Sequence, residues 1–128
     1  MKYLFKSVRL GFRPWENEDI AFLYKLCADK EVMRHFPRTL NLKQTGEFLD
    51  RLQKHQQKHG YCYFMAELLE TKQSIGFIGL AYQNYDSAYT PCTDIGWRLM
   101  PEFWGKGLAT EGALRMIELA RDQFGLSA

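Results

Sequence analysis

A chain of 128 residues is long enough for one domain with its own hydrophobic core, and 46% hydrophobic with 25% charged residues is ordinary for a globular protein. The formal net charge of +2, with no run of Lys or Arg that concentrates it, argues against a nucleic-acid-binding surface. The best apolar run, Ile75–Tyr82, is too short to span a bilayer, so we expect a soluble, cytoplasmic protein with no membrane partner.

The cysteines argue for a reducing compartment. Cys27, Cys62 and Cys92 are odd in number and widely spaced, which does not suit a disulfide framework. Their spacing also differs from that of zinc ligands, so we expect no metal site.

The first predicted elements are a strand and a helix. Apolar and polar residues alternate from Leu4 to Pro14, which predicts one strand that ends where proline removes a backbone donor. Apolar residues then recur at i, i+3, i+4 and i+7 from Ile20, which predicts a helix over about Glu18–Ala28. A short helical turn is expected over Glu31–His35.

A longer helix follows. Asn41 and Gln44 resemble a capping pair, and the helix is expected to run to about Lys58 and to end at Gly60. His55 and His59 are expected on its polar face.

Three strands and a last helix complete the chain. Tyr61–Leu69 and Ser74–Tyr85 predict a hairpin, and Cys92–Met100 a further strand after a loop at Asp86–Pro91. Helical spacing of apolar residues predicts an amphipathic helix over Leu108–Phe124. The order of elements predicts a single α+β domain over residues 1–128, with a mostly antiparallel sheet and helices on both faces.

The turn before the last helix carries the chemical signal. Gly105 and Gly107 allow close backbone approach, the helix start offers free N–H groups, and Lys106 adds a positive charge. This combination predicts a pyrophosphate site. A P-loop is excluded by the spacing, and a dinucleotide fingerprint is excluded because Thr110 stands where Gly or Ala is needed.

The segments Asp94–Leu99 and Pro101–Glu111 resemble the acetyl-CoA motif of the GNAT family of N-acetyltransferases, in particular the branch that acetylates ribosomal-protein N-termini. Gly107 and Ala109 match the last two fixed positions of the family motif, whereas Trp104 replaces its Gln or Arg. The resemblance extends to Arg13-Pro14-Trp15 and to Glu31–Pro37. It implies the GNAT acyltransferase fold and acetyl-CoA as cofactor.

The resemblance also implies direct attack of an amine on the thioester, through a tetrahedral oxyanion, with coenzyme A leaving as the thiol. A backbone N–H near Leu99 or Met100 is expected to face the oxyanion. The base is expected to be Asp94 or His35, although a loop-anchoring aspartate and an exposed loop histidine are the plainer interpretations. The expected cofactor-binding residues are Leu99, Met100, Trp104, Gly105, Lys106, Gly107, Leu108, Ala109 and Thr110.

Neighbouring residues have plainer expected roles. Glu102 and Glu111 are expected to serve the turn and the helix start, where negative charge is favourable. Trp97 is expected to pack in the core, and Trp104 to pack or to contact the ligand about equally.

The acceptor is left open between a peptide α-amine and a small-molecule amine, and is expected to be selected by loops at Phe36–Leu40 and Asp86–Pro91. In the family a further strand follows the last helix, so the resemblance implies a C-terminally truncated domain that a homodimer could complete. The alternative functions are a non-catalytic remnant that binds coenzyme A, and a structural or interaction module.

Overall fold

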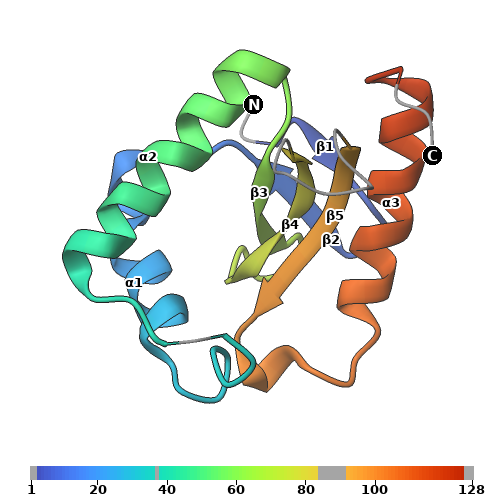
Figure 1. Ribbon diagram of the computed structural model, residues 1–128. Helices are drawn as coiled ribbons and strands as arrows, with labels where there is room; N and C mark the ends of the chain where they lie inside the picture. Colours follow the sequence, from blue (N-terminus) through green and yellow to red (C-terminus); the bar gives the residue numbers. More distant parts are fainter. Residues whose placement is uncertain (1–2, 37, 84–91, 126–128) are drawn as a thin grey trace.

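The computed structural model describes residues 3–36, 38–83 and 92–125, and shows one sheet between two layers of helices (Figure 1). The sheet has five strands in chain order, and every pairing among them is antiparallel. The strands are β1 (Phe5–Lys6), β2 (Leu10–Arg13), β3 (Tyr63–Leu68), β4 (Ser74–Gln83) and β5 (Cys92–Leu99).

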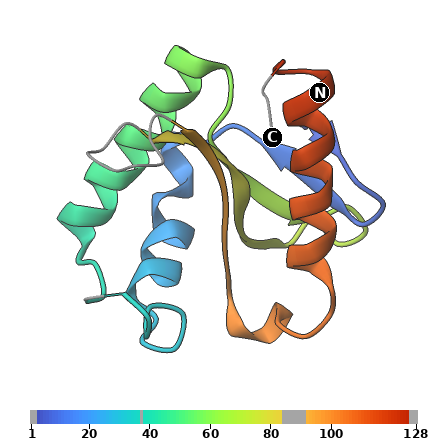
Figure 2. The same ribbon diagram turned by 45° about the vertical axis from the view of Figure 1, so that its right-hand side comes forward.

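Helices cover both faces of this sheet. Figure 2 shows α1 and α2 on one side and α3 on the other. The helices are α1 (Ile20–Ala28), α2 (Leu42–His59) and α3 (Leu108–Asp122), with short 3-10 turns η1 (Asn17–Asp19) and η2 (Pro101–Phe103). The predicted α+β fold, with a mostly antiparallel sheet and helices on both faces, is confirmed.

The N-terminal strand prediction was wrong in one respect. Residues 4–14 form a hairpin of two short strands instead of one long strand, because the Ser7 N–H donates to the Leu10 carbonyl at 2.8 Å and closes a turn. Val8, at the tip of this turn, is 90% exposed. The bend is held from outside: Glu111 of α3 accepts hydrogen bonds from the Ser7 hydroxyl and the Arg9 N–H.

Local capping signals defined α2 correctly. The Asn41 side chain accepts from the Gln44 N–H at 2.8 Å, and the Gln44 side chain accepts from the Asn41 N–H at 2.9 Å. Gly60 ends the helix in the left-handed conformation, with φ of 80°. The predicted capping box and glycine stop are both confirmed.

His55, expected on the polar face of α2, directs its ring nitrogens to the backbone of the sheet region. Its Nε2 accepts from the Tyr82 N–H at 3.0 Å, and its Nδ1 lies 2.9 Å from the Tyr61 carbonyl oxygen. Strand β3 begins only at Tyr63, which pairs with Gly79 of β4, so the ladder does not reach Tyr82. A side chain from α2 therefore bonds a β4 amide that β3 leaves unpaired.

Helix α3 lies close over β4 and β5. A Cβ on Gly112 would lie 2.4 Å from Cδ1 of Ile78, so glycine at this position allows the helix to approach the sheet. The predicted loop at Asp86–Pro91, and the last two residues of the predicted strand Ser74–Tyr85, lie outside the described residues.

Candidate functional site

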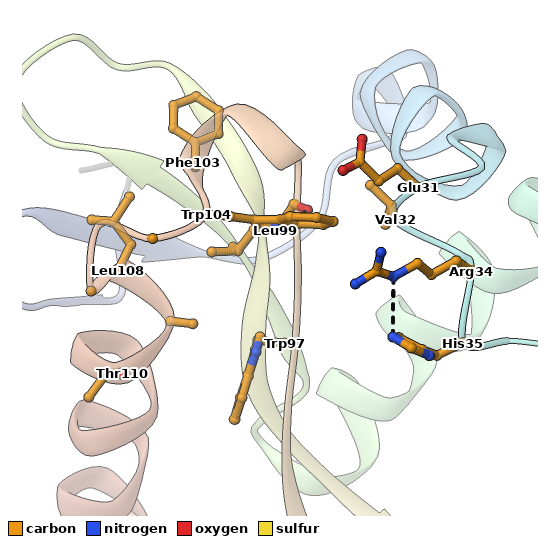
Figure 3. Close-up of a pocket in the computed structure, with 13 residues that line it drawn as sticks. Glu31, Val32, Arg34, His35, Trp97, Leu99, Phe103, Trp104, Leu108 and Thr110 are labelled. Carbon is orange, nitrogen blue, oxygen red and sulfur yellow. Dashed lines mark hydrogen bonds between the residues drawn. The ribbon is translucent and has the colours of Figure 1, made fainter.

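An open cavity of about 450 Å³ lies at the end of β5, and the predicted glycine turn forms one of its walls (Figure 3). The turn and the start of α3 contribute Trp104, Gly105 and residues 107–110. The facing wall is the turn at residues 31–35, whose Arg34 and His35 side chains point into the same space as the Trp104 ring. Trp97 and Leu99 of β5 form the floor between these walls.

The glycine turn has the backbone geometry of an anion cradle. Gly105 and Gly107 have φ of 75° and 77°, a conformation that residues with side chains rarely adopt. A Cβ on Gly105 would meet nothing within 4 Å, so its surroundings are open. The first amide of α3 that bonds within the helix is that of Glu111, to the Gly107 carbonyl at 3.0 Å. The amides of residues 108–110 therefore have no helical partner.

An arginine that the sequence analysis missed lies against this turn. Arg9 donates from Nη1 to the Lys106 carbonyl at 3.0 Å, and its Nη2 would lie 3.6 Å from a Cβ on Gly107. Glu111 anchors it through an Nε–Oε1 contact of 2.7 Å. No local pattern joins residue 9 to residue 107, because their proximity depends on how the β1–β2 hairpin meets α3.

Glu111 serves the turn and the helix start, as expected. Burial acts to raise the pKa of its carboxyl, but hydrogen bonds from Ser7 and Arg9, together with the Arg9 charge, outweigh burial and leave the pKa lowered. The carboxylate is therefore stabilised in its ionised form and holds the Arg9 guanidinium beside the turn.

The two predicted oxyanion donors, the N–H groups of Leu99 and Met100, point in different directions at the end of β5. The Met100 N–H donates to the Ile75 carbonyl at 2.9 Å, so it is occupied by the sheet. Because hydrogen-bonded and non-hydrogen-bonded pairs alternate along an antiparallel ladder, the N–H and carbonyl of Leu99 point away from β4. The Trp104 indole, which donates to the Leu99 carbonyl at 2.9 Å, lies on that outer side.

The remaining predicted cofactor residues differ in placement. The backbone N–H of Trp104 donates to the Pro101 carbonyl at 3.1 Å and so is not open to a ligand. Lys106 is exposed at the tip of the turn, outside the cavity lining. Leu108, Ala109 and Thr110 line the cavity in the first turn of α3, and Leu108 is the buried one of the three.

The two candidate bases lie in different places. His35 lines the cavity, with its exposed ring accepting from the Arg34 Nε at 3.3 Å. Asp94 is not in the cavity lining; it accepts from the Tyr63 hydroxyl at 2.9 Å. Because side chains alternate across a strand, Asp94 lies on the face of β5 opposite to Trp97 and Leu99.

The expectation that Trp97 packs in the core was wrong, since this residue is 53% exposed and lines the cavity. Trp104 is 39% exposed; its ring lines the cavity, and its indole N–H donates to the Leu99 carbonyl of β5. Two indole rings thus offer flat apolar surface beside the glycine turn.

The described part of the chain holds neither a metal-binding cluster nor a membrane-spanning helix. Within residues 3–36, 38–83 and 92–125, no group of three or more His, Cys, Asp or Glu side chains is arranged to hold a metal ion. No helix in these ranges is long and apolar enough to cross a membrane.

Comparison with known proteins identifies the fold and its family. Residues 9–128 match the model of the acetyltransferase (GNAT) domain. This chain belongs to the GNAT acetyltransferase family. It is also similar to the YkkB protein of Bacillus subtilis, with 27% identity over 123 residues that cover 94% of this chain and 70% of YkkB.

Solved structures of GNAT proteins share this fold. An acetyltransferase from Agrobacterium tumefaciens superposes with a TM-score of 0.79 at 24% identity, covering 95% of this chain and 68% of that one. The spermidine N-acetyltransferase of Vibrio cholerae, solved with CoA and spermine, superposes with a TM-score of 0.71 at 22% identity, covering 92% and 67%.

The site fits the acyl donor of the GNAT family. Its glycine turn offers helix-start amides that have no partner within α3. Two cations lie near the turn: Arg9, which is paired with Glu111, and Lys106, which lies outside the cavity lining. Among the described residues that line the cavity, Glu31 alone carries a carboxylate, and it belongs to the opposite wall. The indole rings and the outward-facing edge of β5 leave room for a slender apolar arm between the turn and Leu99.

Proposed function

We propose that this GNAT protein transfers an acetyl group from acetyl-CoA to a primary amine by direct attack. The observation that carries the proposal is one cavity that combines the glycine turn, the free side of Leu99 and the His35 turn. When bound, acetyl-CoA supplies a thioester: the amine would add to its carbonyl carbon to give a tetrahedral oxyanion, the C–S bond would then break, and the amine proton would pass through a base or water to the departing thiolate.

The residues of the chain have distinct proposed roles. The amides of residues 108–110, with Arg9 and Lys106, hold the pyrophosphate. The Leu99 N–H, directed away from β4, is placed to donate to the thioester carbonyl oxygen, where a fixed donor is most effective as charge develops. Met100 acts through the sheet, because its hydrogen bond to Ile75 fixes the end of β5.

A base is needed because a primary amine is largely protonated at neutral pH. His35 lies in the cavity, and histidine ordinarily changes charge near neutral pH. Asp94 lies on the opposite face of β5, with the Tyr63 hydroxyl on its carboxylate. The variants His35→Gln and Asp94→Asn distinguish the two candidate bases. In a plot of kcat/KM against pH, the rise on the acidic side reports ionisation of the base, so only the variant that lacks the true base should lose that rise.

The acceptor is proposed to be a peptide α-amine or a small-molecule amine, and a homodimer that completes the sheet beside β5 remains a prediction. Light scattering at two protein concentrations tests the dimer. A single monomer mass at both would contradict it.

Calorimetric titration with acetyl-CoA at two salt concentrations tests the donor site. Salt-weakened binding supports the pyrophosphate turn, and the matched control is an acetylated pantetheine, which lacks the pyrophosphate and should bind weakly with little salt dependence. Release of free thiol with an amine panel then tests turnover. Binding without thiol release would favour the non-catalytic alternative, and no binding by a folded sample would favour an interaction module.

A further inference from the structure

A second cavity, of about 370 Å³, is lined by arginines and aromatic rings. Arg38, Arg51 and Arg98 contribute three guanidinium groups, and Phe36 and Phe48 contribute ring faces. No described residue that lines it carries a carboxylate. We call this space the arginine cavity.

Arg98 has an incomplete set of partners. Its guanidinium lies over the rings of Phe36 and Phe77, at 4.4 and 5.1 Å from their centroids, and Nη1 donates to the Cys27 sulfur at 3.5 Å. Its Nε is buried and has no hydrogen-bond partner among the residues that the structure describes. Buried polar atoms are nearly always bonded, so an unpaired guanidinium nitrogen in a cavity wall indicates a missing acceptor.

The other two arginines also lack counter-charges. Among the residues that the structure describes, neither Arg38 nor Arg51 forms an ion pair, and both are exposed at the cavity rim. Arg51 lies over the Phe48 ring at 5.7 Å. Guanidinium groups bind carboxylate and phosphate through paired hydrogen bonds, so three of them around one space favour an oxyanion.

The arginine cavity and the first cavity are lined by neighbouring residues of the same turn and the same strand. Met33 and Phe36 line it from the same turn whose Arg34 and His35 line the first cavity. Arg98 is the neighbour of Trp97 and Leu99 in β5, but its side chain lies on the opposite face of the strand. The Leu99 N–H points away from β4, out from the edge of β5, so a ligand held in the arginine cavity would reach it by extending over that edge.

We infer that the acceptor is an amine that also carries a carboxylate or phosphate group, and that Arg38, Arg51 and Arg98 hold this group. The inference rests on the proposed function and names its substrate class. Polyamines are excluded as good acceptors, because three cations would repel them, and Arg98 is a positioning and specificity residue.

Matched acceptors test the inference. O-Phosphoethanolamine is compared with ethanolamine, and phenylalanine with phenylalaninamide, with spermidine as the cationic case, by release of free thiol. The anionic member of at least one pair should have a kcat/KM about tenfold or more above its partner. Arg51→Gln should remove most of that advantage through KM, leaving the neutral member unchanged. Lys54→Gln, on the same helix and paired with Asp50 outside the cavity, should change neither.

The outcomes separate the inference from the proposed function. Turnover of neutral or cationic amines as fast as their anionic partners would overturn the inference and leave acetyl transfer intact. If no amine causes release of free CoA thiol, the proposal of acetyl transfer fails. A second measurement then tests whether the arginine cavity binds an oxyanion: thermal unfolding of the CoA-loaded protein in phosphate or in chloride at equal ionic strength. Stabilisation by phosphate that Arg51→Gln removes would support an oxyanion site, and an equal melting temperature in both salts would overturn it.

Discussion

Arg13 on β2 and Arg98 on β5 are both largely shielded from solvent, but the fold surrounds them differently. Arg13 donates from Nε to Glu67 at 2.8 Å and through its two terminal nitrogens to Asp19, each at 2.8 Å. Arg98 contacts rings and a thiol, and its Nε has no partner. The first arginine is part of the scaffold, and the second keeps donors available for a ligand.

The same contrast holds around these two groups. Glu67 is 2% exposed and also accepts from the Tyr3 hydroxyl at 2.7 Å, and burial together with this bond raises the pKa of Tyr3 to about 12. The glycine turn resembles the arginine cavity instead, since its helix-start amides have no partner within α3. Mutation of a charged group that is paired within the protein is therefore expected to lower stability. Mutation near donors without a protein partner is expected to weaken ligand binding instead.

The largest expected effect is on stability. Glu67→Gln should lower the free energy of unfolding by about 3 kcal/mol, because it removes the most deeply buried counter-charge of Arg13 and leaves Asp19 and the exposed Glu16. Urea unfolding measures the loss. Glu118→Gln, which removes an exposed partner of Arg115, is the control and should cost no more than about 0.5 kcal/mol. A loss below about 1 kcal/mol for Glu67→Gln would mean that the two arginines do not differ as described.

The next effect is on binding. Gly107→Glu should weaken acetyl-CoA binding about 100-fold or more by placing a negative charge at the proposed phosphate position, measured by calorimetry. Gly107→Ala is the control, because it carries the cost of a positive φ, about 1 kcal/mol, without the charge. Similar affinities for the two variants would contradict the proposed phosphate position.

A smaller, pH-dependent effect is expected at Glu111. The folded pKa of its carboxyl is lowered, so its contribution to stability is present above the ordinary pKa of 4.5 and is lost as pH falls through the folded value. Glu111→Gln should therefore be less stable than the parent chain by about 1 kcal/mol at pH 7, and the gap should close below pH 4. Thermal unfolding across this range measures the difference, and a gap independent of pH would contradict it.

The smallest expected effect is on the stability of a variant in the arginine cavity. Arg51→Gln should change the free energy of unfolding by no more than about 0.5 kcal/mol, since no carboxylate is left without a partner. Urea unfolding in phosphate-free buffer measures the change. A loss above about 1.5 kcal/mol would place Arg51 with Arg13 among the structural arginines.

Short-range patterns in the sequence were sufficient for several elements. Asn41 with Gln44, and Gly60, fixed the ends of α2 because caps and left-handed glycine stops depend on residues three or four apart. The glycine turn before α3 could be predicted for the same reason. The N-terminal hairpin could not, since its bend depends on Glu111, more than 100 residues away in the chain.

The sequence by itself determined the α+β class, the order and approximate bounds of most elements, and the glycine turn. Each follows from periodicity or from chemistry within a few residues. The tertiary structure alone decided that Arg9 lies at the turn, that Trp97 is exposed, and that Arg13 is paired while Arg98 is not. These facts depend on contacts between residues far apart in the chain, and a linear pattern does not encode which side chains the packed sheet and helices bring together.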